Sequence, residues 1–150
     1  SDGLTLTVTL REGLRFHDNE PVRARDVVAS FNRWARRDSF GQLAVAALGE
    51  VRALDDRRVE WRFTRRFPLI LDAMAKVAPM FVMPERHANT DPFTQITEAI
   101  GSGPYRFNRG EWVPGSRSVY ERNAAYVPRQ EAANMLAGGK VANFDRIEWR

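Results

Sequence analysis

The spacing of apolar side chains changes sharply near the start of the chain. Between positions 4 and 10, leucine and valine alternate with threonine, a period of two that predicts a strand with one buried face. Between positions 24 and 37 the period becomes 3.6, which predicts an amphipathic helix. The apolar residues of this second stretch are Val27, Val28, Phe31, Trp34 and Ala35. Pro21 disfavours an earlier helix start, so we expect the helix to begin just beyond it.

Arg23 occupies the predicted N-cap of this helix. An N-cap side chain normally supplies an oxygen that accepts a hydrogen bond from a free N–H group of the first turn. Arginine carries only donors and cannot do so. Asp26 in the first turn still interacts favourably with the helix dipole. We therefore expect a helix that is weakened at its start but begins at this position.

Further elements follow in the middle of the chain. Residues 40–48 have the spacing of a short helix that ends at Gly49. Two alternating runs, 51–53 and 59–63, flank the polar residues 54–57 and predict a hairpin.

The segment after this hairpin contains three prolines in apolar surroundings. Pro68 suits the first turn of a helix that continues to Val77. The apolar stretch 78–84 is bracketed by prolines and too short for a helix, so we expect an extended, buried segment. Residues 85–88 are expected to form one helical turn.

The last third of the chain predicts a second hairpin and a final strand. The hairpin consists of runs 105–108 and 116–122, and residues 129–139 are expected to form a surface loop. The alternation over 144–149 predicts the last strand, and we expect Ile147 to face the core. The tryptophans expected in the core are Trp34, Trp61 and Trp149, and the one expected to be exposed is Trp112.

These elements predict an α+β (mixed α/β) chain with a mostly antiparallel sheet and covering helices. With 150 residues, 43% of them hydrophobic, one domain is expected. The net charge of +4 comes almost wholly from arginines, which are scattered along the chain, so nucleic-acid binding is not expected. The absence of cysteine excludes disulfides and thiolate metal sites. The sequence has neither a signal peptide nor an apolar run long enough to span a membrane.

The sequence completes none of the common catalytic, phosphate-binding or metal-binding patterns. His17, Asp18 and Glu20 lie too close together in one turn to converge on a metal ion, so we interpret them as a structural turn. The sequence around Gly138–Lys140 lacks the first glycine and the Ser or Thr of a phosphate loop. Ser102 lies between two glycines, but it lacks the spacing of a hydrolase nucleophile and a histidine after it. We therefore predict a protein that is not an enzyme and that has no cofactor and no metal.

Three motifs resemble one family. LREGLRFHDNEPVRARDVVASF begins at Leu10, IGSGPYRF begins at Ile100, and YERN begins at Tyr120 and is followed by Tyr126. In this order they are similar to the signature of the extracytoplasmic solute-binding proteins of the dipeptide, oligopeptide and nickel class, known as family 5. The family usually has Thr or Asn where this chain has Arg23.

This resemblance implies particular roles for the motif residues. Those expected to be structural are Gly101, Gly103, Pro104, Tyr105, Arg122 and Asn123. We expect Arg122 and Asn123 to tie the second hairpin to neighbouring backbone, and ligand contact is the alternative. Phe40, Met80 and Phe81 are candidates for the solute cleft by analogy with the family, although the same residues would also suit a core.

The resemblance also implies a larger protein. The chain starts without methionine in a strand and stops in an apolar alternation, so we expect an excised piece of the first lobe of a fold like that of type II periplasmic-binding proteins. Residues 1–143 would be the subdomain inserted into that lobe, and residues 144–150 the strand that returns to its main sheet.

The implied function of such a protein is capture of a peptide or similar small solute. The second lobe would be needed for binding, and the solute would pass to the membrane permease of an ABC transporter. The location would be periplasmic or extracellular. A non-transport interaction or sensing module on the same fold is the alternative.

Overall fold

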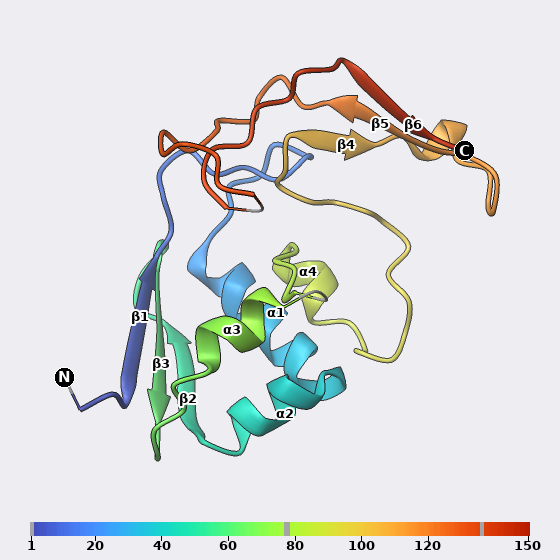
Figure 1. The fold of residues 1–150 in the computed structure, drawn as a ribbon. Coiled ribbons are helices and arrows are strands. Elements are labelled where there is room, and N and C mark those ends of the chain that lie inside the picture. Colours follow the sequence, from blue (N-terminus) through green and yellow to red (C-terminus); the bar gives the residue numbers. More distant parts are fainter. Residues whose placement is uncertain (1, 77–78, 136) are drawn as a thin grey trace. The chain divides into compact units, whose positions relative to one another are not determined.

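The computed structural model describes residues 2–76, 79–135 and 137–150, which form two compact units (Figure 1). Unit 1 comprises Ser1–Glu12 and Val22–Thr97, and unit 2 comprises Gly13–Pro21 and Glu98–Arg150. The composition predicted one domain, but the structure divides into these two compact units. The short segment Gly13–Pro21 belongs to unit 2, although the residues on both sides of it belong to unit 1.

A three-stranded antiparallel sheet forms one layer of unit 1. Its strands are β1 (Thr5–Thr9), β2 (Leu48–Ala53) and β3 (Arg58–Phe63), in the order β1-β3-β2. The turn between β2 and β3 is closed by Asp55, whose carboxylate accepts hydrogen bonds from the backbone N–H groups of Arg57 and Arg58, both at 2.8 Å. The predicted strand and first hairpin are therefore confirmed.

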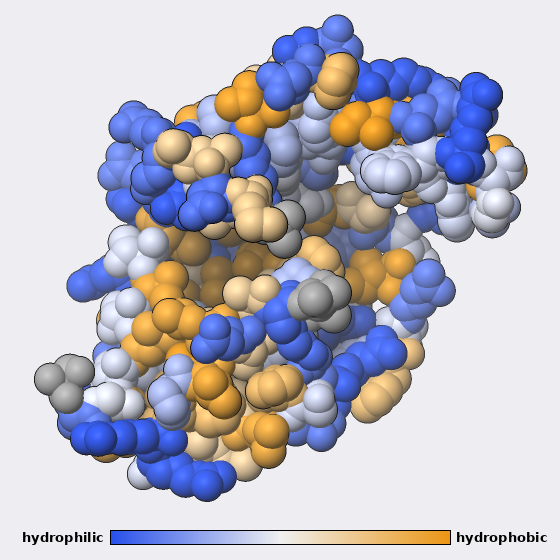
Figure 2. All heavy atoms as spheres, viewed as in Figure 1, coloured by the Kyte–Doolittle hydropathy of each residue, from blue (hydrophilic) through white to orange (hydrophobic). Residues whose placement is uncertain are grey.

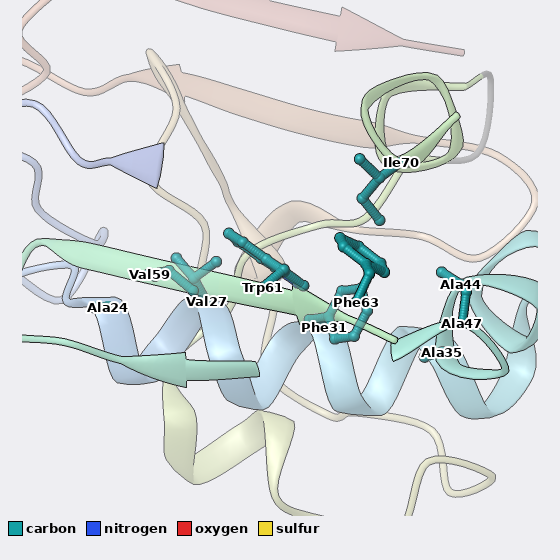
Figure 3. Packing of buried hydrophobic residues seen from close by; sticks show 10 residues of the cluster. All are labelled: Ala24, Val27, Phe31, Ala35, Ala44, Ala47, Val59, Trp61, Phe63 and Ile70. Carbon is teal, nitrogen blue, oxygen red and sulfur yellow. The ribbon is translucent and has the colours of Figure 1, made fainter. Parts of the chain in front are cut away.

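Helix α1 (Ala24–Arg37) covers this sheet and has the predicted bounds. Its buried face packs on the side chains of β3, and the two elements supply most of the core shown in Figure 3. The ring of Phe31 meets that of Trp61 edge-on, with 5.9 Å between centroids. The buried core residues are Ala24, Val27, Phe31, Ala35, Ala44, Ala47, Val59, Trp61, Phe63 and Ile70.

The start of α1 depends on Asp26. Arg23 is the N-cap, and its side chain makes no capping hydrogen bond. Instead, the Asp26 carboxylate accepts a bond from the Arg23 backbone N–H at 2.7 Å. Its other oxygen accepts one from the Glu85 N–H, also at 2.7 Å, at the beginning of α4 (Glu85–Ala88). A buried carboxylate thus satisfies free N–H groups of two helices.

Helix α2 (Ser39–Val45) is shorter than predicted. Leu48 and Gly49 were expected at its end but lie in β2, where Leu48 pairs with Phe63. The Ala47 carbonyl accepts a hydrogen bond from the Thr64 N–H at 2.9 Å. Pairing with β3 therefore satisfies backbone groups that a longer helix would have used internally.

Helix α3 (Ile70–Ala75) starts two positions after Pro68, which lies in the preceding turn. Val77 and Ala78, predicted to end this helix and begin the extended segment, lie outside the described residues. Residues 79–84 form neither a helix nor a strand, and the prediction of a buried segment fails at Phe81, whose side chain is 71% exposed. The predicted helical turn at 85–88 is confirmed.

Unit 2 is built on a second antiparallel sheet, in the order β4-β5-β6. Its strands are β4 (Tyr105–Phe107), β5 (Ser118–Arg122) and β6 (Arg146–Trp149), and the short 3-10 helix η1 (Arg109–Glu111) follows β4. The second hairpin and the last strand are thus confirmed. The described part of 129–139 contains no helix or strand.

Of the two tryptophans in unit 2, one differs from expectation. Ile147 is half-buried, but Trp149 is 67% exposed because it occupies the last pair of an edge strand, opposite Ser118. The prediction that Trp149 lies in the core is therefore wrong. Trp112 is exposed, as predicted, although less so than Trp149. Among the described residues, no helix is both long and apolar enough to cross a membrane.

The N-cap of α1 provides a test of this local structure. Arg23→Thr should raise the free energy of unfolding by about 0.5–2 kcal/mol, because threonine supplies the missing acceptor for the first turn. Guanidinium denaturation would measure this change. Arg25→Thr is the control, since it alters charge in the first turn without occupying the cap. An unchanged or lower midpoint for Arg23→Thr would contradict the cap assignment.

Candidate functional site

The predicted site residues fall into two groups, one in each unit. The cleft candidates Phe40, Met80 and Phe81 lie in unit 1. The motif residues, all in unit 2, are Gly101, Gly103, Pro104, Tyr105, Arg122 and Asn123. Among the described residues, no group of three or more His, Cys, Asp or Glu side chains could hold a metal ion.

The first two sequence motifs meet at His17. The backbone N–H of His17 donates to the Gly101 carbonyl at 2.8 Å. Its ring contributes two more contacts: Nδ1 accepts from the Gly101 N–H at 3.3 Å, and Nε2 lies 3.1 Å from the Gly103 carbonyl. Since a carbonyl can only accept, Nε2 carries the proton and the ring is in the neutral Nε2–H form. Burial lowers the pKa of His17, and the charge of Arg106 acts in the same direction.

Asn123 fixes the same glycine segment from the end of β5. Its side-chain amide donates to the Gly103 carbonyl at 3.2 Å, and its backbone N–H donates to the Pro104 carbonyl at 2.8 Å. Its side-chain oxygen accepts from the Ala125 N–H at 3.3 Å. Asn123 is buried, so these bonds satisfy polar groups that water does not reach. The hydrogen bonds of Asn123 therefore connect the segment 103–104 to the turn after β5, and we call this set of bonds the bracket formed by Asn123.

Arg122 and Tyr105 tie the same sheet to the segment before β6. The Arg122 guanidinium forms an ion pair with Asp145, and its backbone N–H donates to the Asp145 carbonyl at 2.8 Å. The Tyr105 hydroxyl donates to the Phe144 carbonyl at 3.1 Å. The side chain of Arg122 thus contacts a carboxylate, whereas the sequence indicated neighbouring backbone.

Phe40 in unit 1 lies at the start of α2, beside a short network of charges. Asp38 caps this helix by accepting hydrogen bonds from the N–H groups of Phe40 at 2.9 Å and Gly41 at 3.2 Å. Its second oxygen lies 2.5 Å from the Lys76 ammonium, which also sits over the Phe40 ring at 5.7 Å from the centroid. Burial raises the pKa of Asp38, but the bonds from Lys76 and the helix N–H groups outweigh it, and the net pKa is lowered. Phe40 is 39% exposed.

Met80 and Phe81 lie on a segment without helix or strand, and hydrogen bonds fix its backbone before and after Phe81. The Met80 N–H donates to the Met74 carbonyl at 2.9 Å, and the Met80 side chain packs against the core. Beyond Phe81, the Met83 N–H donates to the hydroxyl of Ser30 at 3.0 Å, and that hydroxyl donates to the Met83 carbonyl at 3.3 Å. Phe81 therefore projects from a fixed backbone, which distinguishes it from Met80.

The position of Ser30 was not singled out from the sequence. It is buried on the apolar face of α1, between Val27 and Phe31. A serine within an apolar stripe is the one signal that could have revealed a partner outside the helix. Figure 2 shows that apolar side chains gather on the visible face of unit 1, over α3 and the neighbouring strands. Exposed apolar residues of unit 1 include Leu43, Val45, Leu69, Leu71 and Phe81.

The fold has several solved counterparts. NikA from Brucella suis, determined in complex with Fe(III)-EDTA, superimposes with a TM-score of 0.77 at 20% identity, covering 99% of this chain and 28% of that chain. AgaA from A. tumefaciens R10, determined in complex with agropinic acid, gives 0.68 at 18% identity with the same coverages. The two antiparallel sheets and their helices thus have the fold of type II periplasmic-binding proteins, and the predicted α+β class is confirmed.

Sequence comparison gives the family. The chain belongs to the family described as bacterial extracellular solute-binding proteins, family 5 Middle, whose model matches residues 1–150. It is 39% identical over 148 residues to a probable peptide ABC transporter periplasmic-binding protein of Sinorhizobium fredii, covering 99% of this chain and 28% of that protein. It is 35% identical to Protein XP55 of Streptomyces lividans, covering 83% of this chain and 23% of that protein. The chain therefore spans about a quarter of the length of these relatives.

The bracket formed by Asn123 can be tested by truncation. Asn123→Ala should lower the free energy of unfolding by about 1–3 kcal/mol, because the buried Asn123 side chain loses its part-buried hydrogen bonds with the Gly103 carbonyl and the Ala125 N–H. Thermal and chemical denaturation would measure the loss. Asn134→Ala, at an exposed position in the same unit, should have little effect. Equal stabilities for both variants would mean that the bracket is not required.

A buried and an exposed phenylalanine of unit 1 should differ in how much their side chains contribute to stability. Phe31→Ala should cost about 3–5 kcal/mol of unfolding free energy because it leaves a cavity in the core. Phe81→Ala should cost less than about 0.5 kcal/mol, as expected for an exposed side chain. Denaturant midpoints of the two variants would measure both values. A loss of several kcal/mol for Phe81→Ala would identify Phe81 as a packing residue.

Proposed function

We propose that this chain is part of a protein that captures a peptide or similar small solute and delivers it to the membrane permease of an ABC transporter. The observation that carries this proposal is the family match over all 150 residues. The similar protein of Sinorhizobium fredii, named as a probable peptide-binding component of such a transporter, supports the substrate class. The protein would act outside the cytoplasm, in the periplasm or extracellularly, and would bind without catalysing a reaction.

Within that protein, the chain would belong to the first lobe. Residues 1–143 would form the subdomain inserted into the lobe, and residues 144–150 would return to its main sheet. The pairing of β6 with β5 supports a sheet that includes the end of this chain. Strand β4 pairs with β5 in the same sheet. The change from unit 1 to unit 2 at Thr97–Glu98 would correspond to a further boundary before β4.

Phe40, Met80 and Phe81 would form this chain's contribution to the solute cleft. Phe81 is the strongest of the three because its ring is exposed while its backbone is held by neighbouring bonds to Met80 and Met83. A rigidly presented aromatic ring loses little conformational freedom on binding and buries a large apolar area. Met80 packs against the core and would contribute mainly by supporting that ring.

Binding in such a protein would involve closure of two lobes around the solute. Each lobe would provide one wall, and closure would remove most of the solute surface from water. The favourable free-energy terms would then come from buried apolar contacts and from hydrogen bonds or ion pairs formed between polar groups inside the closed cleft. One wall leaves the ligand largely hydrated, and an exposed ion pair contributes less than about 1 kcal/mol.

The role of Phe81 can be tested in the full-length protein. Phe81→Ala should weaken solute binding by about tenfold or more without changing stability, because a buried aromatic contact is lost only in the complex. Calorimetric titration with the solute identified by native mass spectrometry of the purified protein would measure it. Phe93→Ala is a matched control, since Phe93 is equally exposed at 71% but lies outside the proposed surface. Equal affinities for both variants would remove Phe81 from the cleft.

The two-lobe requirement gives a separate test. Residues 1–150 alone should bind the same solute more weakly than about 1 mM, which corresponds to no more than roughly 4 kcal/mol of binding free energy. Parallel titrations of this chain and of the full-length protein would make the comparison. Equal affinities would place the whole site within residues 1–150. Absence of any solute or permease interaction for the full-length protein would favour the interaction or sensing module instead.

A further inference from the structure

We propose that His17 and the backbone of Gly101–Gly103 form a pH-sensitive clasp that restrains the loop Gly13–Pro21 at neutral pH and is weakened on acidification. The name His17 clasp is used below for the two contacts of the imidazole ring, with the Gly101 N–H and with the Gly103 carbonyl. These contacts join positions separated by 84 and 86 residues in the sequence. The clasp is therefore a long-range tie within unit 2.

The loop Gly13–Pro21 also has hydrogen bonds of its own that do not involve the imidazole ring. The Phe16 N–H donates to the Glu20 carbonyl at 2.8 Å, and the Arg15 guanidinium donates to the Asn19 carbonyl at 2.9 Å. Asn19 adopts a φ of 72°, a conformation that asparagine tolerates better than most residues. The side chain of Phe16 is buried. The ring of His17 thus projects from a loop that has its own internal bonds.

The chemistry of the imidazole makes the clasp selective for one protonation state. The Gly101 amide donates and the Gly103 carbonyl accepts, so the ring must present one lone pair and one N–H. Only the neutral Nε2–H form does this. Protonation adds a hydrogen at Nδ1, which then faces the Gly101 N–H, and two donors cannot bond to each other. The Gly101 amide loses its ring acceptor while it remains partly buried.

Space around the ring is also limited. A Cβ atom added at Gly101 would lie 3.3 Å from Cε1 of His17, so the backbone approaches the imidazole closely at this point. This close approach gives a physical reason for glycine at position 101, in addition to its place in the motif.

The charged groups near the ring act in opposite directions. Burial lowers the pKa of His17, the bond to the Gly103 carbonyl raises it, Arg106 on β4 lowers it and Asp18 on the loop raises it. Arg15 and Glu20 are the other charged residues of the loop. The net pKa lies below the usual value of about 6.5 for an unfolded chain. The stability contributed by the clasp is therefore fully present above about pH 6.5 and is lost as the pH falls through the lower pKa of the folded state.

The consequence concerns a connecting loop. Gly13–Pro21 leaves β1 and leads into α1, both of which belong to unit 1, while the loop is counted with unit 2. Protonation would remove the bond between the ring and the Gly101 N–H, while the bond from Nε2–H to the Gly103 carbonyl and the bond from the His17 backbone N–H to the Gly101 carbonyl would remain. Acidification would thus loosen a link in the chain without unfolding either sheet.

The tautomer and the pH dependence can be measured by NMR on the full-length protein uniformly labelled with 15N. At pH 7.5, His17 should show the Nε2–H tautomer. As the pH falls through the His17 titration, the protection factor of the Gly101 amide against hydrogen exchange should drop by about five- to tenfold, as expected for loss of one hydrogen bond. The Asn123 amide, bonded to the Pro104 carbonyl, provides an internal reference that should not change.

Two variants complete the test. His17→Asn places a non-titrating oxygen near the position of Nδ1, so Gly101 protection should become independent of pH. His87→Asn is the matched control, because His87 is the other histidine of the chain, and this variant should retain the pH dependence. An Nδ1–H tautomer at neutral pH would overturn the proposal. Constant Gly101 protection across the His17 titration would also overturn it, and both results come from the unmodified protein even if a variant fails to fold.

Discussion

The packing of α1 on β3 is the interaction on which the rest of unit 1 depends. Phe31 and Trp61 meet edge-on at its centre, and both are almost completely buried. The ring contact adds a directional preference to the large apolar area that the two side chains remove from water. Once α1 is fixed in this way, its polar positions are fixed as well. Asp26 then reaches the start of α4, and Ser30 reaches Met83.

Buried polar side chains organise the irregular segments of both units. Asp26 and Ser30 bind backbone groups of unit 1 that have no partner within a helix or strand, and Asn123 does the same in unit 2. An unpaired buried N–H or carbonyl would cost about 1–3 kcal/mol, so each of these bonds restricts where the backbone can lie. Irregular segments of the chain are thus held in place by few side chains. Hydrogen bonds of this kind at Met83, together with the backbone bond of Met80, fix the backbone around Phe81 while its side chain stays exposed.

The residues that carry the family resemblance differ from the proposed solute contacts. The motifs around His17, Gly101 and Asn123 carry the resemblance, and the side chains of His17 and Asn123 bond to the backbone of unit 2. We therefore interpret them as architectural, whereas the proposed solute contacts lie on the surface of unit 1. A motif can identify a family through residues that build its fold, while the residues that select a solute lie elsewhere and follow no motif.

The sequence by itself determined the regular elements whose side chains repeat. The bounds of α1, the turn at 54–57 and the hairpin of β4 and β5 follow from local periodicity and turn chemistry, which need no distant partner. Tertiary structure alone decided where α2 ends, that Trp149 is exposed, and that Ser30 and His17 bind distant backbone. The reason is physical: these outcomes depend on which backbone group or surface comes within hydrogen-bonding or packing distance. That proximity is set by contacts between residues far apart in the chain, and local patterns carry no record of them.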